Sequence, residues 1–253
     1  MIIEDPCYLR QLCRNNKFTI KTSGLCKYYV HTNIIILPEE YADDFKLFCQ
    51  KNEKPCPLIE MLDIGSKEAK CALGSNISTD LPKYNVYEKG ILIDTPNNIE
   101  KYWNNKLVTF LLGCSNSFEH HIIKENIKLK HIELDKCVAM YKTNVDTYKT
   151  KYFSGKLVVS MRLINKDDLE KVIEITNRYP LYHGGPVHIG DHNEIGIKDI
   201  TKPEWGDYIQ PDEDDIMVFW ACGATVKTIV ENSKPDLAIV HEPSCMFVTD
   251  LSN

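Results

Sequence analysis

The chain has 253 residues, which is enough for one large domain or two small ones. Hydrophobic residues make up 43% and charged residues 26%, as in ordinary globular proteins, and the formal net charge is −6. This mildly acidic balance gives no electrostatic reason to bind nucleic acid or an anionic membrane surface, so we expect neither as a partner.

No apolar segment reaches the roughly 20 residues that cross a bilayer, and the first residues, MIIEDPCYLRQLCRNN, lack the apolar core of a signal peptide. We therefore expect a cytoplasmic protein. Its ten cysteines are scattered, with no Cys-x-x-Cys pair and no zinc-finger spacing. In a reducing compartment most should be free thiols in the core rather than members of a disulfide scaffold.

Helices and buried strands alternate in the first half of the chain. Apolar periodicity and the positions of proline predict a helix over 4–15, a buried strand over 31–38, a helix over 38–52, a rigid connector over 54–62, a turn-rich segment over 78–90, a short helix over 99–106 and a buried strand over 107–112.

The pattern changes after residue 130. Short β-type runs at 136–144, 155–164 and 185–191 predict an antiparallel sheet with one open face. Between them, residues 165–180 form the clearest helical pattern, with Asn165 as its N-cap. The earlier pattern then returns, with a strand and helix over 215–232, a buried strand over 236–243 and a last β run over 245–251.

Buried apolar strands that alternate with helices are typical of parallel α/β sheets. We therefore predict an α/β fold with a parallel or mixed sheet flanked by helices and a smaller inserted α+β domain. The main domain would be discontinuous, from residues 1–125 and 213–253, and the inserted domain would span 126–212.

Two segments, LLGCSNS (111–117) and FWACGAT (219–225), share one plan: a strand, a turn with cysteine beside glycine, and small hydroxyl residues that open a helix. At the carboxyl ends of strands, a helix N-terminus offers N–H groups to an anion such as a carboxylate and lowers the pKa of a nearby thiol. The alternative is that small residues are needed only for close packing. The candidates for the site are Cys114, Ser115, Ser117, Cys222, Gly223 and Thr225.

The densest polar cluster is YHGGPVHIGDH (182–192). Histidine titrates near neutral pH, so His183 or His188 could be a general acid or base. The alternative is a hydrogen-bonded histidine in a loop. Metal binding by His183, His188 and Asp191 is conceivable, but His-x4-His is not a sharp zinc spacing, and we predict no metal.

Further polar groups end other apolar runs. Arg162 in SMR should pair a carboxylate of the protein or of a substrate, and His241 and Glu242 follow another strand. Together these groups suit a small carboxylate-bearing substrate. The remaining candidates are Ser160, Tyr141, Thr143 and Asn144. No P-loop, dinucleotide fingerprint or Gly-x-Ser-x-Gly elbow is present, so we expect no cofactor.

Several motifs in order resemble the D-glutamate cyclase family of hydro-lyases: TNIIILP, TDLPKYNVY, LLGCSNSFE, MYKTN, GKLVVSMR, ITNRYPLYHGGPVHIGD and VFWACGATVK. The resemblance runs from about residue 24 to the C-terminus. It implies a two-domain α/β protein and a carbon–oxygen lyase. For the family's namesake the reaction is loss of water from D-glutamate to give 5-oxo-D-proline. Asn116 and Gly185 depart from residues common in the family, and both lie beside candidate site residues.

The leading hypothesis is an intramolecular dehydration, or a related hydro-lyase step, on a small amino- or hydroxy-acid. Arg162 would clamp a substrate carboxylate, His183 or His188 would carry protons, and the turn amides at 114–115 and 222–223 would stabilise oxyanion charge. One rival is a two-thiol racemase or epimerase that uses Cys114 and Cys222. Another is a binding protein for a small carboxylate with no turnover. The substrate, and whether the chain forms a homo-oligomer, stay open.

Overall fold

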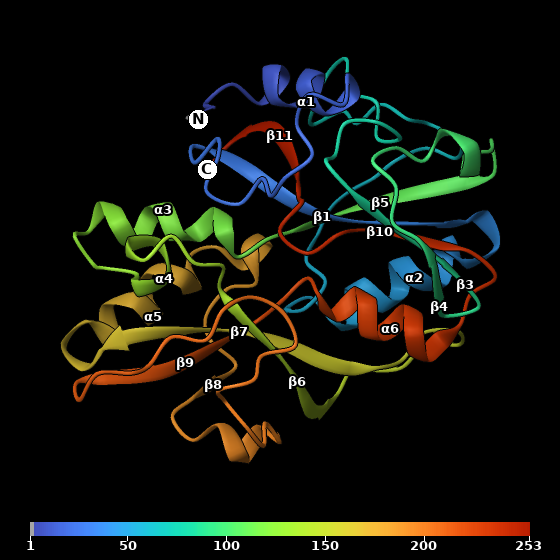
Figure 1. The fold of residues 1–253 in the computed structure, drawn as a ribbon. Helices are drawn as coiled ribbons and strands as arrows, with labels where there is room; N and C mark the ends of the chain where they lie inside the picture. Colours follow the sequence, from blue (N-terminus) through green and yellow to red (C-terminus); the bar gives the residue numbers. More distant parts are fainter. Residues whose placement is uncertain (1–2) are drawn as a thin grey trace.

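The computed structural model describes residues 3–253, which form two β-sheets, one at the upper right and one at the lower left of Figure 1. The larger sheet has the order β2-β5-β1-β10-β3-β4, with β11 also paired to β1, and the smaller sheet has the order β6-β7-β9-β8. The strands are β1 (Tyr29–Pro38), β2 (Leu58–Met61), β3 (Tyr84–Glu88), β4 (Ile91–Asp94), β5 (Leu107–Gly113), β6 (Ala139–Asp146), β7 (Lys156–Asn165), β8 (His188–Ile189), β9 (Asp215–Ala221), β10 (Ala238–His241) and β11 (Phe247–Ser252).

Side-chain caps begin the first helix and the 3-10 turn before the fifth helix, whereas the second to sixth helices have no side-chain cap. The Asp5 carboxylate accepts a hydrogen bond from the Tyr8 N–H at 3.1 Å, and the Asn165 side chain caps a 3-10 turn as expected. The helices are α1 (Pro6–Arg14), α2 (Glu39–Lys51), α3 (Asn116–Lys124), α4 (Lys130–Glu133), α5 (Leu169–Asn177) and α6 (Thr225–Ser233), with 3-10 turns η1 (Glu100–Tyr102), η2 (Lys166–Asp168), η3 (Pro180–Tyr182) and η4 (His192–Ile195).

The predicted combination of helices and sheet in an α/β fold is confirmed, but the predicted direction of the main strands is wrong. Every strand pairing in residues 3–253 is antiparallel, including those of β1 with β5 and with β10. The apolar run of β1 arises because both faces of the sheet are covered. A strand buried on both faces is apolar throughout, whichever way its neighbours run.

Different parts of the chain pack on the two faces of the larger sheet. On one face, Phe45 of α2 and Ile229 of α6 belong to one apolar cluster with side chains of the sheet, and the rings of Phe45 and Phe110 of β5 lie 4.9 Å apart. On the other face, Ile34 and Ile36 of β1 meet apolar side chains of the 62–103 segment. Helices therefore cover one side of this sheet and loops cover the other.

The smaller sheet is antiparallel, as predicted for the middle of the chain. Residues 215–221, which the sequence had grouped with the larger sheet, form β9 and pair with β7 in this smaller one. Helices α3 and α5 pack on the sheet face that carries Ile164 and Trp220. The division into domains at 126 and 213 stays a prediction.

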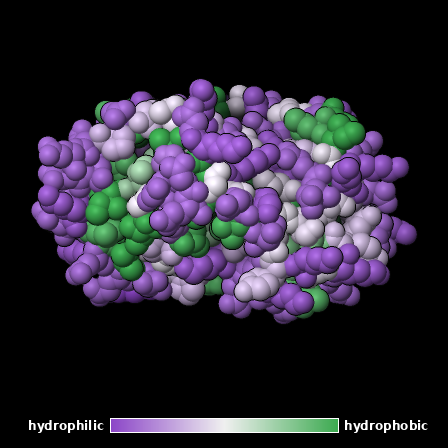
Figure 2. All heavy atoms as spheres, turned by 90° about the horizontal axis from the view of Figure 1, so that it is seen from below, coloured by the Kyte–Doolittle hydropathy of each residue, from purple (hydrophilic) through white to green (hydrophobic). Residues whose placement is uncertain are grey.

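Figure 2 shows a mostly hydrophilic face with hydrophobic residues in separate small patches. From residue 3 to residue 253, no helix is both long and apolar enough to cross a bilayer. All ten cysteines are free thiols and seven of them are buried, which confirms the expectation for cysteine.

Candidate active site

A cavity of about 530 Å³ is lined by residues from both sheets. The turn after β5, the turn after β9 and the segment after β10 all meet there, and β1 adds His31 and Asn33. The cavity therefore collects the ends of three strands.

Both cysteine-containing turns line this cavity, through Cys114 and Ser115 on one side and Cys222 and Gly223 on the other. A methyl group at Gly223 would lie 2.0 Å from the Asn33 amide nitrogen, so only glycine fits that turn. Ser115 and Gly223 both line the cavity, and their backbone N–H groups have no partner within the described part of the chain.

The thiols of these turns differ from the expectation. Burial raises the pKa of Cys114 to about 12, and it also raises the pKa of Cys222. The Asn116 and Ala224 N–H groups act in the opposite direction but are outweighed. The predicted lowering of the thiol pKa is therefore wrong: both turns lie at the start of a helix, but both thiols are buried, and burial has the larger effect on the pKa.

A buried ionic network adjoins the turn that contains Cys114 and Ser115. The Arg162 guanidinium donates to Glu119 Oε1, with Nε at 2.9 Å, and also to the hydroxyls of Ser115 at 3.1 Å and Ser160 at 3.0 Å. The His131 Nε2 atom lies 3.0 Å from the same Glu119 oxygen. Burial alone would raise the pKa of Glu119, but Arg162 and His131 outweigh it and lower that pKa to about 2.

Arg162 is fully buried and its guanidinium also lies 4.9 Å from the centroid of the Phe118 ring. The carboxylate that it binds is Glu119 of the protein itself. A role for Arg162 in holding a substrate carboxylate stays a prediction. Glu119 and His131 are not among the site residues predicted from the sequence, although Ser115 and Glu119 stand four residues apart at the start of α3, which is the spacing of one helix face.

Four histidines line the cavity: His31, His120, His131 and His241. His241, at the end of β10, was noticed in the sequence but not chosen. Its Nδ1 atom lies 2.8 Å from the Glu242 carbonyl oxygen, and its Nε2 atom lies 3.0 Å from the Asn33 amide oxygen. Burial lowers the pKa of His241 to about 4. Its ring nitrogens are both occupied by groups of the chain.

The two histidines preferred from the sequence do not line the cavity. His183 is buried, its Nδ1 atom donates to the Lys54 carbonyl at 2.6 Å, and burial lowers its pKa to about 4. His188 on β8 has Nε2 2.7 Å from the Asp191 carbonyl oxygen. No group of three or more His, Cys, Asp or Glu side chains in residues 3–253 is placed to hold a metal ion. The conceivable site at His183, His188 and Asp191 is therefore not formed.

Most of the other candidates hold the fold together. The Ser117 hydroxyl accepts from the His31 N–H, the Thr225 hydroxyl donates to the Cys222 carbonyl, and the Tyr141 hydroxyl donates to the Ile200 carbonyl. Asn144 is exposed, and its carbonyl accepts from Lys156.

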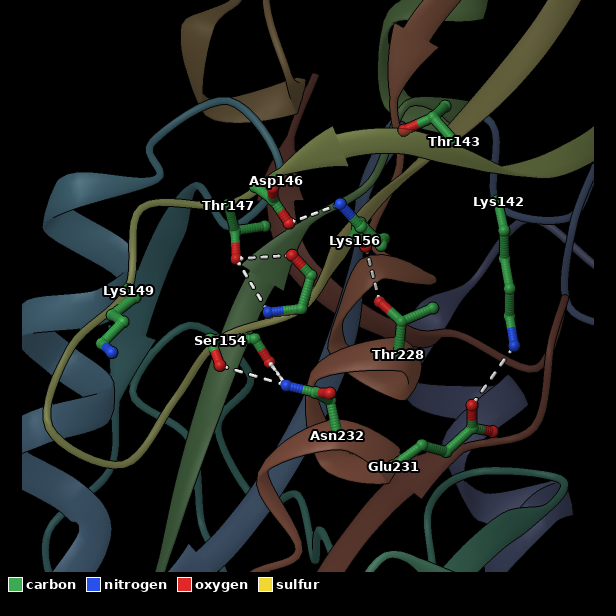
Figure 3. Close-up of a pocket in the computed structure, with 11 residues that line it drawn as sticks. Lys142, Thr143, Asp146, Thr147, Lys149, Ser154, Lys156, Thr228, Glu231 and Asn232 are labelled. Atoms are coloured by element: carbon green, nitrogen blue, oxygen red, sulfur yellow. Dashed lines mark hydrogen bonds and ion pairs between the residues drawn. The ribbon is translucent and has the colours of Figure 1, made fainter. Parts of the chain in front are cut away.

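Thr143 lies in a second groove, of about 570 Å³, between the β6–β7 hairpin and α6 (Figure 3). The side chains there are largely paired with one another. Lys142 points to Glu231 and Lys156 points to Asp146 (Figure 3). Of the three lysines that line this groove, Lys149 is the one with no ion pair within residues 3–253.

Positive charge dominates the cavity between the sheets. Among residues 3–253, the carboxylates that line it are Glu119, which binds Arg162, and Asp135. The cavity lysines form no ion pair with any carboxylate in the described part of the chain, and they are Lys21, Lys27, Lys124, Lys136 and Lys227. A cavity with this charge favours an anionic ligand.

The family model for D-glutamate cyclase matches residues 108–250. A protein of Pelagibacter ubique, named "Putative hydro-lyase", is 47% identical over 99% of this chain and 97% of its own length. Relatives with the same kind of name occur in Cupriavidus taiwanensis (45% identical, 100% of this chain and 95% of the relative) and Geobacillus kaustophilus (44%, 96% and 92%). The chain therefore belongs to the D-glutamate cyclase family.

A solved structure of a nitrogen repressor-like protein from Methanococcus jannaschii aligns with 86% of this chain and 86% of that chain, at 11% identity and a TM-score of 0.40. A likeness of that strength supports no conclusion about this protein.

Proposed function

We propose that this protein is a hydro-lyase for a small amino- or hydroxy-carboxylic acid, and that its reaction is the loss of water from D-glutamate to give 5-oxo-D-proline. The observation that carries the proposal is the cavity with five lysines that lack carboxylate partners. The match to the D-glutamate cyclase family, and relatives named as hydro-lyases, support the same reaction class.

The cyclisation requires one bond to form, one bond to break and two protons to move. The amine nitrogen attacks the γ-carboxyl carbon, a C–N bond forms, and a C–O bond breaks. Two protons move from nitrogen to the departing oxygen, which leaves as water. The lysines would bind the α-carboxylate, and the free N–H groups of Ser115 and Gly223 would stabilise charge on the oxygen of the tetrahedral intermediate. Holding the two ends of the substrate together can supply much of the barrier reduction.

The direct test is incubation of the purified protein with D-glutamate, L-glutamate and other small carboxylic acids, with product followed by proton NMR. Formation of 5-oxo-D-proline is expected from D-glutamate. The variant Lys227→Met should raise KM by about tenfold, since a hydrogen bond to a charged group contributes about 1.5 kcal/mol and tenfold in affinity corresponds to about 1.4 kcal/mol. Lys171→Met, on α5 outside the cavity, is the matched control. No turnover of any acid in the panel would exclude an enzyme of this class.

A racemase or epimerase is a second candidate because Cys114 and Cys222 line the same cavity. Such an enzyme would exchange the α-proton of its substrate for deuterium in heavy water, whereas the cyclisation leaves the α-proton in place. Loss of exchange in both Cys114→Ser and Cys222→Ser would support it. A ligand that raises Tm but stays chemically unchanged would instead indicate a binding protein.

A further inference from the structure

We infer that His131 is a general acid–base residue of this cavity, oriented by the carboxylate of Glu119, which Arg162 holds in place. The inference rests on the proposed function, since a dehydration must take protons from one substrate atom and deliver them to another. Neither His131 nor Glu119 was expected from the sequence.

The four cavity histidines differ in what their ring nitrogens contact. Both nitrogens of His241 face groups of the chain, and His31 binds the Leu25 carbonyl with Nε2 while its Nδ1 atom is sealed from solvent. His120 has a sealed Nε2 atom and no carboxylate partner. In His131, one nitrogen binds Glu119, and the other has no protein partner among residues 3–253 and is not sealed. His131 alone among them combines a carboxylate partner with an accessible nitrogen.

Glu119 determines which nitrogen of His131 is available. The carboxylate accepts the hydrogen bond from Nε2, so the proton of the neutral ring resides there and the lone pair is on Nδ1. Arg162 keeps the same carboxylate ionised, and the pKa of Glu119 is lowered to about 2. A carboxylate that orients a histidine and stabilises its charged form is a recurring arrangement for proton transfer.

Contacts on both sides of His131 fix the position of its helix, α4. The preceding residue, Lys130, pairs with Asp212 and with Asp215, the first residue of β9. The His131 carbonyl accepts from the Lys136 N–H at 2.8 Å. These contacts make α4 a fixed support, although it has only four residues.

His131 would carry two protons, one after the other, from the substrate nitrogen to one carboxyl oxygen. Nδ1 takes one proton from the substrate ammonium, which frees the nitrogen lone pair to attack the γ-carboxyl carbon. The imidazolium, stabilised by Glu119, gives this proton to a carboxyl oxygen. The transfer repeats with the second proton of the nitrogen, so the oxygen leaves as water and His131 returns to its starting state.

The kinetic test compares the wild type with His131→Gln. A missing acid–base group should lower kcat by about 10²–10⁴-fold, with a much smaller change in KM. His121→Gln is the matched control, because His121 is a half-buried histidine outside the cavity. A wild type that turns over D-glutamate and a His131→Gln variant within threefold of it would overturn this inference and leave the proposed function standing. An inactive wild type would overturn both.

The role of Glu119 has a readout that does not depend on turnover. In ¹⁵N NMR spectra, His131 of the wild type should show a protonated Nε2 and a lone pair on Nδ1. Glu119→Gln should give a mixture of the two tautomers, and the His121 signals should not change. A wild-type ring protonated on Nδ1 would contradict the assignment. If Glu119→Gln fails to fold, the wild-type spectrum alone decides the tautomer.

Discussion

Replacing Gly223 by alanine should disturb the cavity through a single neighbour. A Cβ at this position would lie 2.0 Å from Nδ2, 2.2 Å from Cγ and 2.6 Å from Oδ1 of Asn33. All three are atoms of one side chain, so Asn33 must move away. Its amide nitrogen would then leave the Gly113 carbonyl, now at 2.6 Å, and its oxygen would leave His241 Nε2, now at 3.0 Å.

The expected cost has two parts. Overpacking a buried site costs about 1–3 kcal/mol, and leaving a buried polar group without its hydrogen bonds costs about 1–3 kcal/mol more. Gly223→Ala should therefore lower the free energy of unfolding by about 2–6 kcal/mol. The backbone of Gly223 does not have a positive φ, so no strain is added to this sum.

Urea unfolding of a double-mutant cycle tests the cause. In an Asn33→Ala background the methyl group meets no amide, and Gly223→Ala should cost less than about 1 kcal/mol. Equal costs in the two backgrounds would refute the explanation. Gly113→Ala is the contrasting variant, because its Cβ would lie 1.7 Å from the Leu181 backbone oxygen, which no side-chain truncation removes.

Three other outcomes follow from buried groups. Glu119→Ala leaves the Arg162 charge buried and unpaired, so urea unfolding should show a loss of about 3–5 kcal/mol, and a loss below 1 kcal/mol would contradict the burial of that pair. His183 and His241 have a pKa of about 4 in the folded chain, compared with an ordinary value of 6.5. As the pH falls from 6.5 to 4, the unfolded chain therefore binds protons at these residues before the folded chain does, and the folded state loses stability. Each histidine should remove up to about 3 kcal/mol of stability over that window. In a series of urea midpoints against pH, His183→Gln should flatten the slope, and an unchanged slope would count against this cause. Iodoacetamide at pH 7.5 should label the exposed Cys7 well before Cys114, because the pKa of Cys114 is raised to about 12. Peptide mass spectrometry measures the order of labelling, and earlier labelling of Cys114 would contradict this prediction.

The sequence was enough to predict the elements but not how they pair. The apolar runs of β1 and β5 and the helical stripe of α5 are local patterns, and the structure has those elements. The direction of strand pairing depends on connections that a local pattern does not encode. For the same reason β9 was assigned to the larger sheet, although its partner is β7.

The candidate site was predictable only where its signal is local. The turns at Cys114 and Cys222 follow a strand–turn–helix pattern that can be read within seven residues, and both line the cavity. The Glu119–Arg162 pair joins residues 43 apart in the sequence, and nothing near either residue indicates the other. The conspicuous His183 contacts the carbonyl of Lys54, 129 residues away, so its loop gave no sign that the side chain is enclosed.

Two of the segments that line the cavity also carry the chain from one sheet to the other. The chain leaves β5 of the larger sheet through Cys114 toward β6, and it leaves β9 of the smaller sheet through Cys222 toward β10. These crossings therefore link the two sheets (Figure 1). A ligand that spans the cavity would contact both crossings, so it would tie the two sheets together at the points where the chain passes between them.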